Sequence, residues 1–407
     1  MLKEVAVAVV ATTVCFIACH GGAADHFAVF ADHLANKGYT VRVYGAGPAS
    51  DKFRAHQTAN LYVFSPEGVG SEEREAAGIA KACAKVAVVI TDVGHRFGVA
   101  LQKSLADHAP KVLRVAYYDN PEPYVPGGYS ATASRVMQEA HKVVFANANL
   151  AKSPVYREPS QEVSLPRGNK IGLGYYPLEK ARHTAERRES DRTQVRKDFF
   201  SHCGIEDVGQ KMFVYVGGNN EEYFLRAFPA FLRFMADSSA EHDLSDVMIV
   251  LQQHPGARAK NIDAGLVRGW VETHGSNKRA PKVLISHMNT DDALVPADAV
   301  FYYQTSMGPW FVLAGIPTVQ VGHEKYDDIL VKNKLAQVVN SAEDFVNVLQ
   351  TLQENKPRIA SKVVEEGLGV DSDWPGKLDD VVHLLTQSVR NIREGGKRSQ
   401  GEPLSLS

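Results

Sequence analysis

Glycine, histidine and carboxylate residues gather in one short segment near the start of this chain of 407 residues. Residues 20–26 read His-Gly-Gly-Ala-Ala-Asp-His. Glycines let the backbone approach a ligand closely, and the start of a helix attracts anions. The imidazole of His26 could act as a general base near neutral pH, with Asp25 as an alternative base or as a helix cap. A tight turn followed by a capped helix would explain the same residues without a ligand.

Two further loops of the first half carry side chains that could serve catalysis. Residues 118–124 read Tyr-Asp-Asn-Pro-Glu-Pro-Tyr; their carboxylates and aromatic rings suit a polyhydroxylated acceptor, although a proline-stiffened loop is the alternative. Residues 91–95 supply Asp92 as a second candidate base, whereas a single loop histidine such as His95 is usually just exposed. The candidate acceptor-binding residues are His20, Gly21, Gly22, Asp119, Asn120 and Glu122.

Three loops of the second half have the composition of a phosphate site. Residues 217–222 read Gly-Gly-Asn-Asn-Glu-Glu, in which free backbone N–H groups suit a diphosphate and the glutamates suit a first helical turn. Residues 253–256 read Gln-His-Pro-Gly, and residues 304–308 read Gln-Thr-Ser-Met-Gly before a helix, where capping alone would explain one hydroxyl. The candidate donor-binding residues here are Gly217, Gly218, Asn219, His254, Gln304, Thr305, Ser306 and Gly308.

These loops follow short apolar segments that are typical of strands in parallel sheets. The predicted strands are residues 14–18, 40–44, 61–64, 86–91, 112–117 and 143–146, then 212–216, 247–251, 283–286, 299–303 and 318–321. Helical patterns lie between them, for example at 25–36, 71–84 and 223–236. Short apolar strands alternating with helices predict α/β sheets covered on both faces. Ligands of such sheets bind outside the carboxyl ends of the strands, where the candidate loops lie.

The length of the chain exceeds one ordinary core, so the two strand–helix series predict two domains. Four prolines and a charge-dense stretch lie between residues 149 and 210, and we place the linker near residues 175–177. The expected division is residues 1–170, 178–370, a helix over 371–393 and a polar, glycine-rich, disordered tail over 394–407.

Composition excludes several classes of protein. Hydrophobic residues make up 44% and charged residues 23% of the chain, and the formal net charge is -2, without the basic excess of a nucleic-acid-binding protein. The phosphate loop of P-loop NTPases, the nucleophile elbow of α/β-hydrolases and the dinucleotide fingerprint in the first turn are all missing from the sequence. We therefore do not expect an NTPase, an α/β-hydrolase or an ordinary NAD enzyme.

The cysteines and the apolar N-terminus bear on localisation. Four cysteines have neither a disulfide spacing nor a zinc spacing, so reduced thiols in a cytoplasmic protein are expected, with Cys15 and Cys19 buried on one strand face. Residues 1–19 imitate a signal peptide, but Glu4 weakens the positive flank and residues 14–18 are needed as the first strand. No other apolar run is long enough to span a bilayer.

Taken in order, the motifs resemble the GT-B superfamily of glycosyltransferases, in particular the branch with the peptidoglycan UDP-GlcNAc transferase and the UDP-GlcNAc 2-epimerases. Residues 21–26 are similar to the Gly-Gly-Thr-Gly-Gly-His turn of that transferase, and residues 253–256 resemble the His-Pro motif of polymer-forming transferases. Residues 214–219 look like the first strand and glycine turn of the second domain, and residues 297–318 look like the donor-site segment.

The resemblance implies two Rossmann-like α/β domains facing each other across a cleft, with a terminal helix that returns to the first domain. It implies a nucleotide-sugar donor in the second domain, a glycan or other hydroxyl acceptor in the first, and neither a cofactor nor a metal. Gly21, Gly22 and His26 would approach the acceptor and the donor phosphate, and His26 would be the candidate base.

One residue departs from the family pattern. Many members place a ribose-binding glutamate five residues before the glycine of the Gly-x-Pro turn, where this chain has Trp310. An indole is a donor only and cannot accept two ribose hydroxyls. Either Glu324 or Asp327 binds the ribose, or the donor is unusual, or the protein has lost its chemistry.

Three functions are therefore expected as alternatives. The first is an inverting, metal-independent glycosyltransferase that uses His26, Asp25 or Asp92 as base. The second is a nucleotide-sugar epimerase or hydrolase, for which Asp119 and Glu122 provide carboxylates. The third is a non-catalytic binding protein, which Trp310 favours.

Overall fold

The computed structural model describes residues 12–68, 70–126, 128–166, 168–176, 178–258, 260–286, 288–322, 328–354 and 361–395. Two compact units account for these residues. Unit 1 comprises the described residues up to Tyr175 together with those from Gly369 onward, and unit 2 runs from Tyr176 to Leu368.

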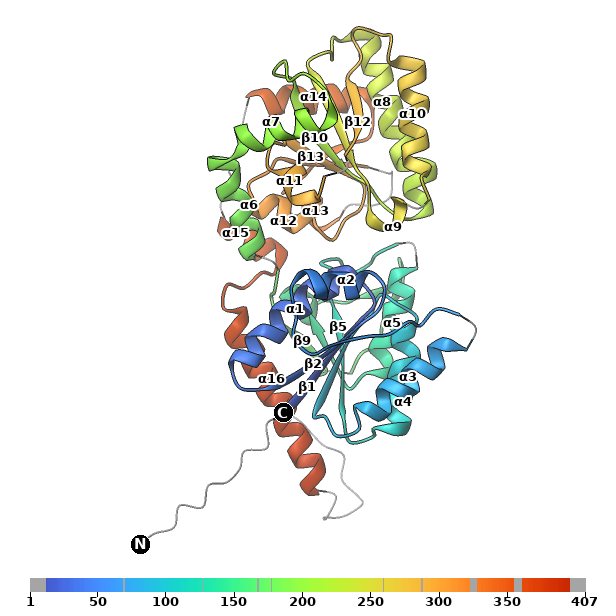
Figure 1. The fold of residues 1–407 in the computed structure, drawn as a ribbon, viewed down its shortest axis with the longest axis vertical. Coiled ribbons are helices and arrows are strands. Elements are labelled where there is room, and N and C mark those ends of the chain that lie inside the picture. The colour runs from blue at the N-terminus through green and yellow to red at the C-terminus, as the bar shows by residue number, and fades with distance from the viewer. Residues whose placement is uncertain are drawn as a thin grey trace. The chain divides into compact units, whose positions relative to one another are not determined.

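Unit 1 is built on a seven-stranded parallel sheet in the order β3-β2-β1-β4-β5-β6-β9 (Figure 1). Its strands are β1 (Thr13–Ala18), β2 (Thr40–Gly45), β3 (Leu61–Val63), β4 (Val88–Asp92), β5 (Leu113–Tyr118), β6 (Lys142–Phe145) and β9 (Lys170–Gly172). The six predicted strands of the first half are confirmed, and β9, a three-residue strand at the edge of the sheet, was not predicted. The strand order reverses between β1 and β4, which is where a doubly wound sheet opens a crevice for ligands.

Helices cover both faces of this sheet (Figure 1). One face carries α1 (Gly21–Asn36), α2 (Pro48–Ala55) and α16 (Trp374–Gly395), and the other carries α3 (Ser71–Ala82), α4 (Phe97–His108) and α5 (Tyr129–Glu139). A short helix η1 (Ala148–Ala151) and a hairpin of β7 (Tyr156–Glu158) and β8 (Gln161–Glu162) complete the unit.

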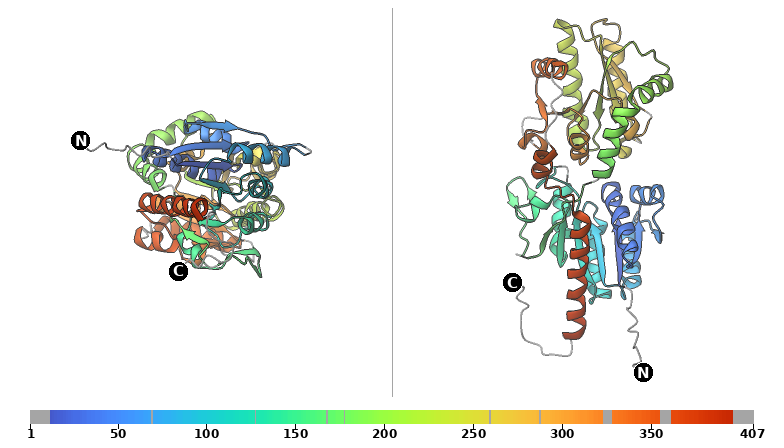
Figure 2. Two further views of the ribbon diagram at one scale, coloured as in Figure 1. Left: turned by 90° about the horizontal axis from the view of Figure 1, so that it is seen from below. Right: turned by 90° about the vertical axis from the view of Figure 1, so that its left-hand side faces the viewer.

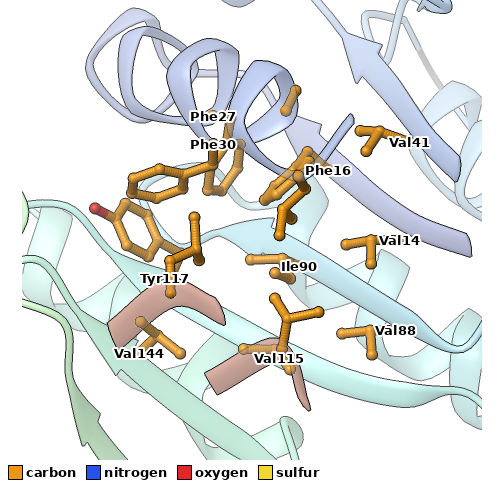
Figure 3. Close-up of a cluster of buried hydrophobic side chains, with 14 of the residues drawn as sticks. Val14, Phe16, Phe27, Phe30, Val41, Val88, Ile90, Val115, Tyr117 and Val144 are labelled. Atoms are coloured by element: carbon orange, nitrogen blue, oxygen red, sulfur yellow. The ribbon is translucent and has the colours of Figure 1, made fainter. Parts of the chain in front are cut away.

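The core under α1 explains why the first strand forms. Phe16 on β1 packs against Phe27 and Phe30 of α1, and Tyr117 of β5 joins them (Figure 3). These side chains are at most 2% exposed, and burying each one contributes roughly 1.5–3 kcal/mol. Helix α16 runs along the same face, where Leu378, Val382 and Leu385 enter this core (Figure 2).

Unit 2 repeats the plan with a six-stranded parallel sheet in the order β12-β11-β10-β13-β14-β15. Its strands are β10 (Lys211–Val216), β11 (Val247–Gln252), β12 (Lys282–Ile285), β13 (Ala299–Tyr302), β14 (Thr318–Val321) and β15 (Gln337–Val339). The five predicted strands of the second half are confirmed, and β15 is an edge strand that was missed. Here the strand order reverses between β10 and β13.

Several helices of unit 2 form a core with one face of its sheet, and Ala257 of the short helix α9 also enters this core. The π-helix η2 (Tyr223–Ala227), α8 (Phe228–Glu241), α10 (Ile262–His274) and α14 (Ala342–Glu354) pack on one face. The others are α6 (Leu178–Ser190), α7 (Arg192–Cys203), α9 (Pro255–Arg258), α11 (Thr290–Leu294), α12 (Gly308–Leu313), α13 (Ile329–Lys332) and α15 (Ser361–Leu368). Helix α12 contacts both α6 and α15.

The start of α1 corrects the sequence-based expectation. The helix begins at Gly21 rather than at Asp25, because the N–H of Ala24 already donates to the carbonyl of His20 at 3.1 Å. Gly21 and Gly22 therefore belong to the first helical turn and not to a loop. Asp25 does not cap the helix, and the N-cap residue is His20.

Burial of the cysteines agrees with the expectation. Cys15 and Cys19 are both buried in one cluster with Cys83, and all four cysteines are free thiols. No helix in the described part of the chain is long and apolar enough to cross a membrane. The part of the expected polar tail that begins at residue 396 lies outside the described residues.

Candidate functional site

The sequence-predicted loops of unit 1 meet where the strand order reverses, between β1 and β4. The backbone N–H groups of Cys19 and His20, at the end of β1, both donate to Oδ2 of Asp92, at 2.9 and 2.8 Å. Asp92 is the last residue of β4 and is 2% exposed. Its carboxylate therefore joins two neighbouring strand ends and holds the turn from which α1 starts.

Burial raises the pKa of Asp92 above its ordinary value, whereas nearby His20 and the two backbone N–H donors lower it. A carboxylate whose oxygen already accepts two hydrogen bonds inside the protein is poorly placed to take a proton from a substrate. These contacts give Asp92 a structural role in the turn before α1.

The ring of His20, at the end of β1, lies next to Gly94 in the loop after β4. The Cβ of an alanine at position 94 would lie 2.6 Å from Cε1 and 2.7 Å from Nδ1 of His20, so Gly94 is needed for the ring to lie there. The ring of His20 is half-buried, 6.1 Å from the ring of His95 and 6.4 Å from that of Tyr129. Its nitrogens make no hydrogen bond to the described residues. An imidazole that is fixed in place and retains its bonding capacity can accept a proton from a ligand.

The carboxylate of Asp119 also lies next to Tyr129. Tyr129 donates its hydroxyl proton to Oδ1 of Asp119 at 2.7 Å, and Oδ2 lies 2.8 Å from the position that a Cβ on Gly22 would occupy. Burial raises the pKa of Tyr129 well above its ordinary value, so the phenol remains a donor. The Asp119 and Asp92 carboxylates thus face the first turn of α1 and satisfy its positive end, so phosphate binding at that turn would bring like charges together.

His26 lies elsewhere, inside the aromatic core under α1. It is 8% exposed, its Nδ1 is 2.8 Å from the hydroxyl of Tyr117, and the ring of Tyr175 packs edge-on at 4.7 Å. Burial lowers the pKa of His26, so the buried imidazole is neutral at neutral pH. The hydrogen bond and the ring contacts of His26 are thus with the aromatic core residues Tyr117, Phe30 and Tyr175.

This burial predicts a pH dependence of stability. A histidine whose folded pKa is lowered contributes stability that is present above its unfolded pKa and is lost as the pH falls. We expect the free energy of unfolding to decrease as the pH falls below about 6.5, and less steeply in His26→Phe than in the parent protein. Denaturant unfolding between pH 7.5 and pH 5 measures both slopes. His108→Phe, at an exposed position of α4, is the control, and an equal slope in the parent and His26→Phe would contradict the prediction.

The remaining candidates of unit 1 take part in local structure. Asp25 pairs with Lys52 at 3.0 Å and with His56 at 3.2 Å, which ties α1 to α2. Asn120 accepts the N–H of Glu122 at 3.0 Å within the loop after β5, and Glu122 is 6% exposed. The structure therefore brings His20, Asp92 and Asp119 together and leaves Asp25 and Glu122 in structural contacts.

In unit 2 the predicted loops after β10 and β13 are joined directly. Asn220 donates from Nδ2 to Oε1 of Gln304 at 2.8 Å, and its Oδ1 accepts the N–H of Tyr223. Nε2 of Gln304 is buried and has no hydrogen-bond partner among the described residues. This pair lies where the strand order reverses, as the His20–Asp119 group does in unit 1.

Three glycines of unit 2 have structural explanations that the sequence did not reveal. The N–H of Gly217 is not free, because it donates to the carbonyl of Gln252 at 2.9 Å. A Cβ on Gly218 would lie 2.8 Å from the ring of Tyr223, and one on Gly308 would lie 2.7 Å from Cδ1 of Leu330. These glycines permit close packing of side chains, so the predicted supply of free N–H groups at Gly217 is wrong.

The other polar candidates of unit 2 lie on the loops that follow β10, β11 and β13. Thr305 accepts the N–H of Met307 at 3.1 Å, Ser306 is exposed, and the exposed His254 accepts the N–H of Gly256 at 3.0 Å. Asn219 accepts a hydrogen bond from Lys260, a residue that sequence reasoning missed because its position follows a separate loop. Glu324 and Asp327, the proposed ribose partners, lie outside the described residues.

Trp310 has a structural role in unit 2. It is 4% exposed, and its Nε1–H donates to Oγ1 of Thr184 on α6 at 3.1 Å. The ammonium of Lys180 lies 4.0 Å from the centre of its ring. The tryptophan therefore attaches α12 to α6, and a glutamate there would bury a carboxylate. In the described ranges, no group of three or more histidine, cysteine, aspartate or glutamate side chains is arranged to hold a metal ion.

Comparison with known proteins identifies solved structures that have a similar fold. No protein-family model and no curated protein sequence matches the chain. UDP-GlcNAc 2-epimerase from Neisseria meningitidis bound to UDP-GlcNAc has a TM-score of 0.65 and 10% identity, covering 92% of this chain and all of that chain. A glycosyltransferase from Rickettsia africae ESF-5 has a TM-score of 0.62 and 9% identity over 94% and 99% of the two chains. S. aureus MnaA with UDP has a TM-score of 0.62 and 10% identity over 97% and 100%.

At such low identities the likeness shows the fold alone. The chain has the GT-B fold, two Rossmann-like α/β domains, which it shares with epimerases and with glycosyltransferases. The expected fold class is thereby confirmed.

Proposed function

We propose that this protein is an enzyme that acts on a nucleotide sugar, with the nucleotide diphosphate bound in unit 2 and proton transfer carried out in unit 1. One observation carries the proposal: the polar groups of each unit gather where its strand order reverses, His20 and Asp119 in unit 1 and Asn220 with Gln304 in unit 2. Ligands of doubly wound sheets bind at such points.

The reaction we favour is transfer of the sugar to a hydroxyl acceptor. His20 is the base that takes the proton of that hydroxyl, because its ring is fixed by Gly94 and its nitrogens are not bonded to the described residues. Asp92 positions His20 through the backbone, and Asp119 receives a hydrogen bond from an acceptor hydroxyl. The sugar–phosphate bond breaks as the acceptor oxygen attacks, and the diphosphate leaves with its charge held in unit 2.

An epimerase or hydrolase on the same fold is the second candidate. The observation that favours it is a pair of candidate proton-transfer groups that both lie next to Tyr129, the His20 ring and the Asp119 carboxylate. Epimerisation removes a proton from one face of a sugar and returns one to the other, which requires two such groups.

The experiment that separates these functions starts from binding. Calorimetric titration with UDP, GDP and CDP identifies the nucleotide, and NMR spectroscopy of UDP-GlcNAc incubated with the protein identifies a product. A change of configuration in the sugar without an acceptor indicates an epimerase, and release of UDP in water alone indicates a hydrolase. Release of UDP that requires an added hydroxyl acceptor indicates a transferase. A protein that binds no nucleotide contradicts the proposal.

The hydroxyls after β13 provide a further test. Thr305 and Ser306 are expected to donate hydrogen bonds to the diphosphate, and each hydrogen bond to a charged group is worth about 1.5–3 kcal/mol. The double change Thr305→Ala and Ser306→Ala should therefore weaken nucleotide binding about tenfold or more. Ser245→Ala, at an exposed position between α8 and β11, is the control. Unchanged affinity for every nucleotide would remove these residues from the site.

A further inference from the structure

Lys260 is an exposed lysine whose ammonium is nevertheless held in one place. Its Nζ donates to Oδ1 of Asn219 at 3.0 Å and reaches the carbonyl oxygen of Asn219 at 3.5 Å. The same ammonium lies 5.5 Å from the centre of the Phe224 ring. Asn219 is itself confined, because a Cβ on Gly256 would lie 2.6 Å from its Nδ2. Exposed lysine side chains are ordinarily free to rotate, so these contacts fix a charge that would otherwise move.

The charge of Lys260 is not neutralised by the residues that the structure describes. Its contacts are an amide oxygen, a carbonyl oxygen and an aromatic ring, and no carboxylate lies within ion-pair distance. The nearest acidic residue in sequence, Asp263, is fully buried and accepts hydrogen bonds from Gln253 and Tyr223 instead. Arg258, a second cation, is exposed on the same short segment.

Lys260 also extends the row of polar groups at the carboxyl edge of the sheet. Asn219 binds Lys260, the adjacent Asn220 binds Gln304, and Gln304 precedes Thr305. The loops after β11, β10 and β13, three neighbouring strands, are thereby connected. Of the groups in this row, Lys260 alone carries a full charge.

We infer that Lys260 provides the positive charge that binds the phosphate groups of the ligand in unit 2, and that Asn219 is the positioning residue that holds it there. This inference rests on the proposed function. An ammonium has three N–H donors, and two acceptors on Asn219 leave one donor and the whole charge for an anion with several oxygens. A diphosphate provides such oxygens. When it binds, its charged oxygens replace the water molecules around the ammonium of Lys260.

The test compares ligands with and without phosphate. Calorimetric titrations of UDP, inorganic pyrophosphate and uridine are made with the parent protein, Lys260→Met, Lys260→Arg and Asn219→Ala. Lys282→Met is the matched control, since Lys282 is exposed at the start of β12, at the opposite edge of the sheet. Circular dichroism checks the folding of each variant.

Lys260→Met is expected to weaken binding of UDP and pyrophosphate about tenfold or more, and binding of uridine less than twofold. Lys260→Arg should retain most of the affinity. Raising the salt concentration should weaken UDP binding by the parent more than by Lys260→Met, because salt screens the charge of Lys260, which the methionine variant does not carry. Asn219→Ala should lower UDP affinity while keeping the salt dependence of the parent, a readout that a purely structural role of Asn219 would not explain.

Two failures are distinguishable. If Lys260→Met binds UDP as tightly as Lys282→Met does, the inference is wrong, although the proposed function stands. If the parent protein binds none of UDP, GDP, CDP and pyrophosphate, the inference about Lys260 and the proposed function are both wrong. Equal weakening of uridine and UDP by Lys260→Met would also overturn the assignment, since the contact would then not be to phosphate.

Discussion

Replacing His20 by alanine is expected to lower turnover by about 10²–10⁴-fold, the usual contribution of a general base, while leaving the affinity for the nucleotide nearly unchanged. The reason is that the His20 ring lies in unit 1 beside Tyr129 and Asp119, whereas the groups proposed to bind the nucleotide belong to unit 2. Turnover is measured as UDP release, and affinity by calorimetry.

His26→Phe is the matched variant for this prediction. It keeps an aromatic ring in the core under α1, next to Phe30 and Tyr175, and removes the imidazole. We expect it to retain most of the turnover, with some loss of stability because the hydrogen bond between the His26 ring and the Tyr117 hydroxyl is lost. If His26→Phe is inactive and His20→Ala is active, the base is His26, as the motif resemblance implied.

Replacing Asp92 by alanine is expected to lower the free energy of unfolding by about 3 kcal/mol or more, and to lower turnover as well. The carboxylate accepts two backbone N–H groups, and each hydrogen bond to a charged acceptor is worth about 1.5–3 kcal/mol. The alanine variant leaves the N–H groups of Cys19 and His20 unpaired in a buried turn, so the His20 ring also loses its fixed position.

Asp92→Asn and Asp107→Ala complete this experiment, with stability measured by denaturant unfolding. The asparagine keeps an oxygen that can accept both N–H groups without the charge, so we expect an intermediate loss. Asp107 is exposed on α4, and its removal should have little effect. Equal stability of Asp92→Ala and Asp107→Ala would show that the contact between β1 and β4 does not hold the turn.

The glycines show where sequence reasoning about the site reached its limit. A pair of glycines after a strand predicts close approach of the backbone to something, but not to what. At Gly218 the close neighbour is the ring of Tyr223, and at Gly22 it is the carboxylate of Asp119. Asp119 is remote from Gly22 in sequence, and the orientation of the Tyr223 ring over Gly218 is fixed only in the folded chain, so a ligand and a side chain predict the same glycine pattern.

The histidines show the same limit for a different reason. His20 and His26 lie six positions apart around the start of α1, and the motif resemblance selected His26. Once the helix begins at Gly21, the position of His26 in the second turn places its ring against Tyr117 and Phe30, in the core. The helix start depends on Asp92, which lies 72 residues after His20, so no local pattern could have located it.

The sequence by itself determined the α/β class, the strands from β1 to β14 that are apolar and long enough to recognise, and the loops that carry polar groups at their carboxyl ends. Those features depend on local hydrophobic pattern and turn chemistry, which neighbouring residues decide. Only the tertiary structure decided which polar groups meet, because His20, Asp92 and Asp119, or Asn219 and Lys260, come together through the order of strands in the sheet. It also decided that Trp310 is a packing residue, since its partner Thr184 lies 126 residues away on α6.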